Sequence, residues 1–371
     1  MADNKPKLLI VPGDGIGHEV IPQAIKVVSW FEDNRKVAFD ISEGELGVGS
    51  YQRHGTLLPD PTLEKSLASD AVLFGAVGGD GYEDIPMAHR QESGLLALRR
   101  KLGLFANIRP AVAYEELLDA SSLKPEVVRG TDLLIVRELS SGIYFGEPRG
   151  IEDLGDGVRR GFNTMCYTTP EIQRVARLSF ELARNRRNAL CSIEKSNVLE
   201  TSKLWREEVR KLAKEEFPDV EFRELIVDAG AMELIRNPRQ FDVIVTGNMF
   251  GDILSDAAAM LTGSLGMLPS ASLSEPDASG RRNAFYEPVH GAAPDIAGQG
   301  IANPLAAILS FAMALRHTFE AGEDADLLER AVKHAVSGDN RTADIKGSAT
   351  RAISTEDMGD AVIESLNRLS E

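Results

Sequence analysis

Alternating apolar and polar segments along the chain predict strands that are each followed by a turn and a helix. Short apolar runs occur in KLLIVPG near the start, in Asp70–Gly79, in Thr131–Leu139 and in Phe241–Asn248, and each ends in glycine or polar residues. Runs of this kind are typical of strands inside a parallel sheet. By contrast, Pro170–Arg187 has apolar residues at helical spacing, begins with proline and glutamate and ends in arginines, as the helix dipole favours.

Strands that alternate with helices indicate an α/β protein whose ligand-binding groups lie at the carboxyl ends of the strands. The segment Gly94–Leu104 adds a helical pattern with a basic face. The segment Ser140–Thr169 differs from the rest, because it resembles two extended arms around a Gly-Asp turn. Such an arm has little core of its own, so we expect it to pack on another subunit.

The composition narrows the class of protein. The chain has 371 residues, which suits two domains, and is 43% hydrophobic and 26% charged, as globular proteins are. Its net charge of −16 argues against a nucleic-acid or anionic-membrane surface, so an anionic ligand would need a local cluster of arginines. Cys166 and Cys191 lack the spacing of a disulfide framework or zinc site, and the first apolar run is too short for a signal peptide. We therefore expect a cytoplasmic enzyme.

The glycine-rich segment Gly13–Glu19, GDGIGHE, leaves two interpretations open. Its spacing is G-x-G-x-G, which lacks the third glycine of the Rossmann fingerprint. A phosphate cradle and a tight turn between strand and helix both account for it.

Asp252 and Asp256 in TGNMFGDILSDAAAM are one helical turn apart, so their carboxylates share a face and repel each other. A solvated helix face is the simplest explanation of such a pair. The apolar neighbours and the preceding strand end favour another, because Mg²⁺ or Mn²⁺ prefers carboxylate oxygens. A third acid is then expected, and Asp228 follows another apolar run.

Arg99, Arg109 and Arg137 lie within or beside apolar runs, where an unpaired guanidinium would be unfavourable. A lone arginine in such a place is usually half of an ion pair, and Glu138 could be the partner of Arg137. Three of them suggest bidentate binding of carboxylates.

Several motifs together resemble one family over roughly residues 7 to 350: GDGIG, GLLALRRKLGLFANIRPA, VRELSSGIYFGEPRG, EKSNVLE, TGNMFGDILSDAAAMLTGSLGMLPSAS and EPVHGAAPDIAGQGIANP. This is the isocitrate/isopropylmalate dehydrogenase family of β-decarboxylating dehydrogenases. The resemblance implies a fold of two α/β domains with a cleft between them, which is not a Rossmann fold. It places residues 1–104 and 263–371 in the first, NAD-binding domain, and residues 105–262 in the second, which forms a homodimer through an arm at about 140–169.

The activity implied by the resemblance is the NAD-dependent oxidative decarboxylation of (2R,3S)-3-isopropylmalate to 2-oxoisocaproate (4-methyl-2-oxopentanoate) and CO₂, a step of leucine biosynthesis. By the same resemblance Arg99, Arg109 and Arg137 bind the malate carboxylates. Tyr144 and Lys195 are the acid–base pair, with Lys195 supplied by the partner subunit. Lys195, or a water that it activates, removes the hydroxyl proton, and Tyr144 protonates the enolate carbon.

The resemblance also assigns the metal and cofactor sites. Asp252 and Asp256 would hold Mg²⁺ or Mn²⁺, with Asp228 contributed across the dimer and also facing the substrate. Asp295 would accept hydrogen bonds from the adenosine ribose and repel the 2′-phosphate of NADP, which favours NAD. The NAD-binding residues implied are His290, Gly291, Ala292, Ala293, Pro294, Asp295, Ile296, Ala297, Gly298 and Asn303.

Substrate selection is assigned to Glu92, Leu95 and Leu96, with Val198 arriving from the partner. The three apolar side chains suit an isopropyl group, whereas a relative that binds isocitrate would need polar groups there. The chain departs from the family pattern at three positions outside the catalytic set: His18, Gly230 and Glu233.

Other functions fit less well. The nearest alternative is a sister enzyme that acts on malate, tartrate or homoisocitrate. A Mg²⁺-dependent phosphoryl-transfer enzyme would need a motif such as GxxxxGK[ST], which the sequence lacks. A regulatory subunit without activity should have lost some catalytic groups, yet Tyr144, Lys195 and the three aspartates are all present.

Overall fold

The chain forms two compact units in the computed structural model, which describes all residues except 1–4, 36, 88, 91–93 and 350. Unit 1 contains Met1–Leu104, Val112–Gly130 and Ala259–Glu371, and unit 2 contains Phe105–Ala111 and Thr131–Ala258. Unit 1 thus includes the segment 112–130 beside the two ends of the chain. The α/β class expected from the sequence is confirmed.

Unit 1 is built on strands in the order β2-β1-β3-β12-β11. All neighbours along this order are parallel except β11 and β12, which are antiparallel. The strands are β1 (Lys7–Gly13), β2 (Asp40–Glu43), β3 (Ala71–Ala76), β11 (Pro269–Ser274) and β12 (Ala284–Pro288).

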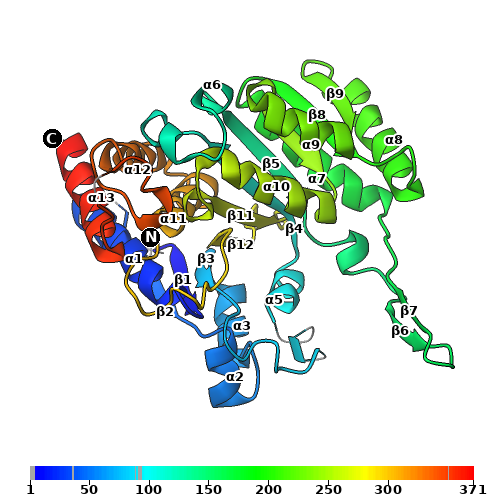
Figure 1. Cartoon of the computed structure of the whole chain (residues 1–371), viewed down its shortest axis with the longest axis horizontal. Coiled ribbons are helices and arrows are strands. Elements are labelled where there is room, and N and C mark those ends of the chain that lie inside the picture. The colour runs from blue at the N-terminus through cyan, green and yellow to red at the C-terminus, as the bar shows by residue number, and fades with distance from the viewer. Residues whose placement is uncertain (1–4, 36, 88, 91–93, 350) are drawn as a thin grey trace. The chain divides into compact units, whose positions relative to one another are not determined.

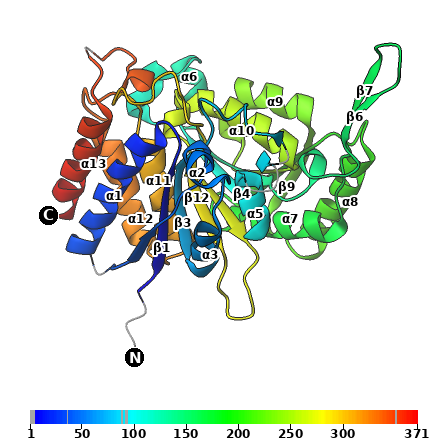
Figure 2. The same cartoon turned by 90° about the horizontal axis from the view of Figure 1, so that it is seen from below.

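Helix α11 (Leu305–His317) forms the centre of the unit 1 core. It is apolar around most of its circumference and buried from Leu305 to Leu315, as a helix covered on all sides must be. It packs on β3, β11 and β12 and on two further helices, α1 and α12 (Figures 1 and 2). The other helices of unit 1 are α1 (Gly17–Asn34), α2 (Val48–His54), α3 (Asp60–Ala68), α5 (Leu95–Lys101), α6 (Pro125–Val128), α12 (Gly322–Ala335) and α13 (Thr355–Ser370), with 3-10 helices at Glu115–Ala120, Leu265–Met267 and Ala343–Ile345.

Unit 2 has its own run of strands in the order β4-β5-β10-β8-β9, and β5, β10, β8 and β9 are parallel to their neighbours in this run. The strands are β4 (Leu104–Val112), β5 (Asp132–Glu138), β8 (Ala189–Glu194), β9 (Glu221–Ile226) and β10 (Val243–Thr246). The helices are α7 (Thr169–Arg184), α8 (Glu200–Glu215), α9 (Val227–Arg236) and α10 (Asn248–Thr262), with 3-10 helices at Gly142–Tyr144 and Pro238–Gln240.

The carboxyl ends of the unit 2 strands carry most of the candidate chemistry. Arg137 is the penultimate residue of β5, Lys195 follows β8, and Asp228 follows β9. Asn248 begins α10, two residues after the end of β10. Parallel strands bring these ends to one edge of the sheet, where α/β proteins bind ligands.

The expected arm is a short hairpin of β6 (Gly150–Asp153) and β7 (Arg159–Phe162), which are antiparallel and extend away from the rest of unit 2 (Figure 1). The start of the 140–169 segment is not extended. It forms the 3-10 helix Gly142–Tyr144, and the Gly142 N–H donates to the Cys166 carbonyl at 3.0 Å.

Among the described residues, no helix combines the length and the apolar composition that crossing a membrane takes.

Candidate active site

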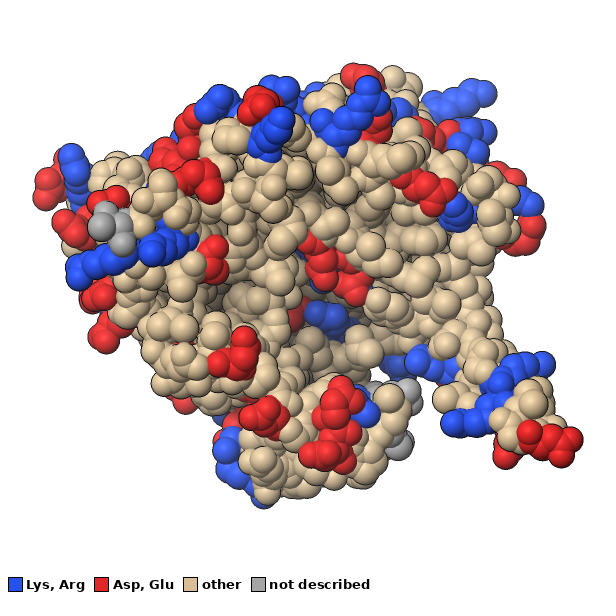
Figure 3. Space-filling view, viewed as in Figure 1, with Lys and Arg blue, Asp and Glu red and all other residues tan. Residues whose placement is uncertain are grey.

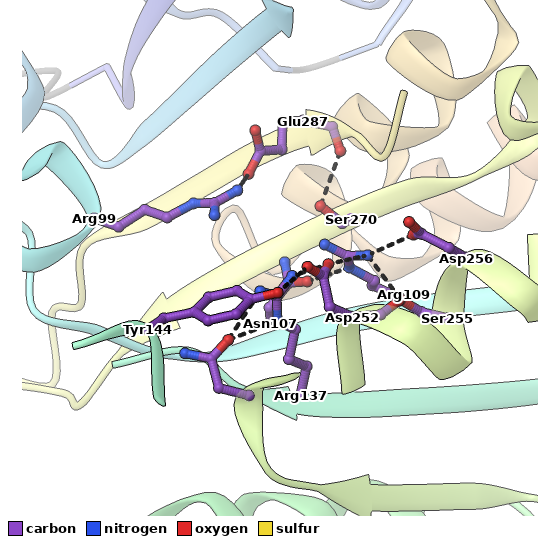
Figure 4. A network of polar contacts seen from close by, with 11 residues as sticks. Arg99, Asn107, Arg109, Arg137, Tyr144, Asp252, Ser255, Asp256, Ser270 and Glu287 are labelled. Atoms are coloured by element: carbon purple, nitrogen blue, oxygen red, sulfur yellow. Dashed lines mark hydrogen bonds and ion pairs between the residues drawn. The ribbon is translucent and has the colours of Figure 1, made fainter. Parts of the chain in front are cut away.

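The two aspartates of α10 lie beside two buried arginines of unit 2 (Figure 4). Asp252 and Asp256 share a face of the helix, with side chains 31% and 59% exposed. Arg109 comes from β4 and Arg137 from β5. The positive charges of the arginines offset the repulsion between the two carboxylates, so the pair is not merely a solvated helix face.

Arg137 is held on both sides of its guanidinium group. Its Nη1 pairs with Asp252, while Nε and Nη2 donate to Asn248 Oδ1 at 3.0 and 2.8 Å. The guanidinium carbon also lies 5.5 Å from the centre of the Tyr144 ring. The side chain is only 4% exposed, and these partners offset the loss of its hydration.

Arg109 is fixed in a similar way. Its Nε donates to Asn107 Oδ1 at 2.5 Å, and its Nη1 donates to Ser255 Oγ at 2.7 Å and to Asp256 Oδ1 at 3.2 Å. Asp252 Oδ1 lies 3.5 Å from the same Nη1. Arg109 therefore lies between the two carboxylates.

Glu138 has a different set of partners from those of Arg137. Its carboxylate accepts hydrogen bonds from the Ser140 N–H at 2.7 Å, the Ser140 hydroxyl at 2.6 Å and the Ser141 N–H at 3.0 Å. Burial raises the pKa of this carboxyl. Consecutive strand residues point to opposite faces of the sheet, so the neighbour in sequence is not the natural ion-pair partner of Arg137.

Tyr144 donates its hydroxyl proton to Asp252 Oδ2 at 2.8 Å. Burial raises the pKa of Tyr144, and the hydrogen bond to Asp252 raises it further. The phenol therefore stays protonated at neutral pH and can serve as a proton donor.

The donor set of the aspartate pair fits a hard divalent cation. Burial raises the pKa of Asp256, and the charge of Asp252 adds to this effect, whereas Arg109 opposes it. The two carboxylates on one helix face still repel each other, and a bound cation would relieve that repulsion. Within the described part of the chain, no group of three or more His, Cys, Asp or Glu side chains could hold a metal ion. A third protein ligand would have to come from elsewhere.

Lys195 and Asp228 form an ion pair with each other, between Nζ and Oδ2. Val198 lies one turn after Lys195, with its N–H donating to the Lys195 carbonyl at 3.1 Å, and is 65% exposed. The structure thus brings the predicted unit 2 residues together in two groups: Arg109, Arg137, Tyr144, Asp252 and Asp256 in one, and Lys195 with Asp228 in the other.

The remaining predicted substrate residues belong to unit 1. Arg99 Nη2 pairs with Glu287 Oε1, and both residues are buried. Leu95 and Leu96 begin α5, where Leu96 is 37% exposed. Glu92 lies outside the described residues.

The predicted cofactor loop after β12 is also in unit 1. A Cβ on Gly291 would meet only the Val77 carbonyl oxygen, at 3.9 Å, so a ligand can approach the backbone there. Burial lowers the pKa of His290, which keeps its ring neutral, and Asp295 is exposed. The side-chain amide of Asn303 donates to Asp344 Oδ2 at 3.0 Å. Small residues, a neutral ring and an exposed carboxylate fit an adenosine group.

Three polar residues that hold the arginines were not identified from the sequence: Asn248, Asn107 and Glu287. The sequence could have indicated Asn248, because it is the first polar side chain after a buried strand. Asn107 is two residues before Arg109 on β4, and thus on the same face of the strand.

Two of the three departures from the family pattern have a local explanation. A Cβ on Gly230 would lie 2.9 Å from Ile193 Cδ1, so glycine lets α9 pack closely on β8. Glu233 accepts a hydrogen bond from Gln240 Nε2 at 2.8 Å.

The chain is similar to known proteins over nearly its whole length. Residues 7–362 match the family model described as isocitrate/isopropylmalate dehydrogenase. The chain is 59% identical over 364 residues to a 3-isopropylmalate dehydrogenase of Paramagnetospirillum magneticum, covering 98% of this chain and 99% of that one. It is 54% identical to a 3-isopropylmalate dehydrogenase of Gluconobacter oxydans, with the same coverage.

Solved structures of dehydrogenases have the same fold as this chain. An isocitrate dehydrogenase from Methylococcus capsulatus superposes with a TM-score of 0.84 at 34% identity, over 97% of this chain and 99% of that one. A β-decarboxylating dehydrogenase from Thermococcus kodakarensis gives a TM-score of 0.78 at 35% identity, over 98% and 96%. Fold and relatives together define a decarboxylating oxidoreductase.

The chain belongs to the isocitrate/isopropylmalate dehydrogenase family. The resemblance of its motifs to this family, and the fold expected from it in place of a Rossmann fold, are confirmed.

Proposed function

We propose that the protein is an NAD-dependent 3-isopropylmalate dehydrogenase. It would convert (2R,3S)-3-isopropylmalate to 2-oxoisocaproate and CO₂ in leucine biosynthesis. The observation that carries the proposal is the cluster of Arg109, Arg137, Tyr144, Asp252 and Asp256 in unit 2, in a chain whose relatives at more than half identity bear this name.

The buried arginines bind the malate carboxylates. Arg109 and Arg137 are already fixed by Asn107 and Asn248, so little side-chain freedom is lost when a substrate binds. A carboxylate accepts two parallel N–H bonds from a guanidinium, which orients the substrate as well as binding it. Arg99, held by Glu287, supplies a third such group from unit 1.

Asp252 and Asp256 would hold Mg²⁺ or Mn²⁺, and Asp228 of a second subunit would complete the protein ligands. The metal would supply a Lewis acid for the oxygen at the reacting carbon. The ion pairs that the aspartates make with Arg109 and Arg137 fix their carboxylates in advance.

Proton transfer is divided between two residues. Lys195 of a second subunit, or a water that it activates, takes the hydroxyl proton. Tyr144 gives a proton to the enolate carbon after CO₂ leaves, a role that its raised pKa supports.

The loop from His290 to Asn303 would hold NAD, which would supply the hydride acceptor. Asp295 accepts hydrogen bonds from the adenosine ribose hydroxyls and would repel a 2′-phosphate. The loop from His290 to Asn303 therefore favours NAD over NADP.

The apolar side chains Leu95, Leu96 and Val198 surround the isopropyl group. Burial of its methyl groups contributes about 1–3 kcal/mol, whereas a carboxylate in their place would lose its hydration without a partner.

A homodimer is part of the proposal, because the site needs Lys195 and Asp228 from a second chain. Lys195 and Asp228 form an ion pair with each other, which supports the proposal that both come from the same second subunit. Unit 2 also exposes large apolar side chains on α9, on α10 and on the arm: Met232, Ile235, Ile253, Ile151, Leu154 and Val158. Such surfaces mark protein contacts.

The test is NADH formation from 3-isopropylmalate by the purified protein. We expect activity that EDTA abolishes and that Mg²⁺ or Mn²⁺ restores, with NAD at least tenfold more efficient than NADP, because a charged group facing the ribose discriminates strongly. Absence of NADH formation with metal present would contradict the proposal. Equal efficiency with NADP would show that Asp295 does not face the ribose.

A further inference from the structure

The segment Gly13–Glu19 contacts the predicted cofactor loop, and its acidic side chains are already engaged. Asp14 is buried, and its carboxylate accepts hydrogen bonds from the N–H groups of Val48, Gly49 and Gly78 at 3.0, 3.2 and 3.1 Å. The backbone N–H groups of the segment itself donate to carbonyls: Asp14 to Ala76 at 2.8 Å and Gly17 to Asp14 at 2.9 Å. A phosphate cradle needs free N–H donors, so these bonds favour the tight turn over the cradle.

The turn touches the cofactor loop through its backbone. Ile16 N–H donates to the Ala292 carbonyl at 2.9 Å. Gly15 has φ +51°, and a Cβ there would lie 2.2 Å from the same carbonyl oxygen. The glycine is therefore required for the close approach of the turn to the loop.

Glu19 holds the far end of the loop. It lies in the first turn of α1, and its two carboxylate oxygens accept hydrogen bonds from two loop N–H groups: Gly298 to Oε1 at 2.5 Å and Gly300 to Oε2 at 2.8 Å. Hydrogen bonds to a charged acceptor are stronger than those between neutral groups.

The loop needs such support because its backbone is unusual. Ala293 has φ +43°, which is uncommon for a residue with a side chain, and Gly298 and Gly300 have φ +79° and +65°. Glycines make many other conformations accessible, and a strained alanine persists only when its surroundings fix it.

We propose that Glu19 is a positioning residue for the cofactor: by accepting from Gly298 and Gly300 it keeps the 290–303 loop in the conformation that binds the adenosine part of NAD. The proposal rests on the proposed function, because it takes that loop as the NAD site. It gives the acidic end of GDGIGHE a role in cofactor affinity, although Glu19 itself need not touch NAD.

The size of the effect follows from preorganisation. When only a fraction of the molecules has the binding conformation, the apparent dissociation constant rises by the inverse of that fraction. The amide of glutamine cannot accept at both ends, so Glu19→Gln leaves one loop N–H without its acceptor. Loss of one such bond corresponds to a rise of about three- to tenfold in the dissociation constant for NAD.

The experiment compares Glu19→Gln with His18→Ala, a change at the exposed neighbouring position, and with the unaltered protein. Steady-state kinetics give KM for NAD, KM for 3-isopropylmalate and kcat. Amide hydrogen exchange of the NAD-free proteins is followed in peptides from the 290–303 loop and in peptides from β8 and β9 of unit 2.

We expect Glu19→Gln to raise KM for NAD by about three- to tenfold, with kcat and KM for 3-isopropylmalate within about twofold of their original values. Exchange should accelerate in the loop and not in β8 or β9, and His18→Ala should change neither quantity. Unchanged loop exchange, an equal rise of both KM values, or a general loss of structure in Glu19→Gln would overturn the proposal. If the unaltered protein does not reduce NAD, the proposed function fails, while the exchange data still decide whether Glu19 holds the loop.

Discussion

At the scale of single residues, the site is governed by buried charges that hold one another in place. Arg137 has Asn248 on one side and Asp252 on the other, and Tyr144 donates to the second oxygen of Asp252. The carboxylate thus links the proposed proton donor to an arginine that we propose binds the substrate. Each of these groups is oriented before a substrate arrives, which is what catalysis by positioning requires.

The proposed division of proton transfer can be tested by substitution of each partner. Lys195→Met should abolish hydride transfer, because the hydroxyl proton then has no acceptor. Tyr144→Phe should still form NADH in a first turnover and slow the later steps, because protonation of the enolate follows oxidation. Rapid-mixing absorbance at 340 nm separates these steps, and an equal loss of the first turnover in both variants would refute the division.

Asp256 gives a prediction for pH and metal. Its pKa in the folded chain is raised above the unfolded value, chiefly by burial. Without metal, its contribution to stability is therefore greatest below the unfolded pKa and is lost as pH rises through the raised pKa. Metal binding needs the carboxylate and has the opposite dependence.

We accordingly expect metal-free Asp256→Asn to be at least as stable as the original protein at pH 7, whereas Mg²⁺ should no longer raise its thermal midpoint. Asp156→Asn on the arm, where a backbone with φ +50° tolerates asparagine, is the matched control and should keep the Mg²⁺ effect. If Mg²⁺ raised the thermal midpoint of Asp256→Asn as much as that of the original protein, Asp256 would not be a metal ligand.

At the scale of elements, the hydrophobic pattern predicted β1, β3, β5, β10 and α7. The helix α5 differs from expectation at its end. The helix expected over Gly94–Leu104 ends at Lys101, because Gly103 turns the chain with φ +66° and Leu104 begins β4. Periodicity does not resolve such an abrupt change from helix to strand.

The partners of the arginines were harder to predict than the arginines themselves. Proximity in the sequence suggested Glu138 as the ion-pair partner of Arg137. In the structure, however, Arg137 pairs with residues of α10 that are more than a hundred positions away. Such contacts depend on which strands are neighbours, and a single sequence does not specify strand order. The aspartate pair was predictable because helical spacing is local.

Gly251 tests how closely α10 approaches β5. Glycine inside a helix is usually less stable than alanine by about 0.5–1 kcal/mol. A Cβ at Gly251, however, would lie 2.7 Å from Arg137 Cβ, so we expect steric repulsion to outweigh propensity. Gly251→Ala should lower the free energy of unfolding and raise KM for the substrate.

The control for this prediction is Gly322→Ala at the start of α12, where a Cβ would meet nothing within 4 Å. Its stability should be unchanged or slightly raised. If Gly251→Ala were as stable and as active as the Gly322→Ala control, α10 and β5 would have more freedom than the structure implies.

At the scale of the whole molecule, the main question is how two chains would complete one site. Both basic and acidic side chains cover the arm, as Figure 3 shows, and they alternate with exposed Ile151, Leu154 and Val158. An apolar surface on so small a hairpin is stabilised only if it is covered. A second copy of the chain, contacting the arm and α9, is the partner that we propose.

Shared sites predict complementation between inactive variants. In the proposed dimer, Lys195→Met removes a group donated to the partner, and Asp252→Asn removes a group used within the chain. Chains carrying one change each, when unfolded, mixed and refolded together, should recover activity, because a heterodimer keeps one intact site. Each variant refolded alone is the control. Failure of the mixed sample, despite heterodimers seen by native mass spectrometry, would mean that Lys195 acts within its own chain.

The central claim is that this chain selects the isopropyl group. In the proposed mechanism the arginines, Tyr144, Lys195 and the metal act on the malate core that these substrates share, so selection must come from groups such as Leu95, Leu96 and Val198. The decisive measurement is kcat/KM for 3-isopropylmalate, malate, tartrate, homoisocitrate and isocitrate under the same metal and NAD concentrations. We predict the highest value for 3-isopropylmalate and almost no turnover of isocitrate, because its third carboxylate would face apolar side chains. A clear preference for malate, tartrate or homoisocitrate would contradict the account and indicate a sister enzyme.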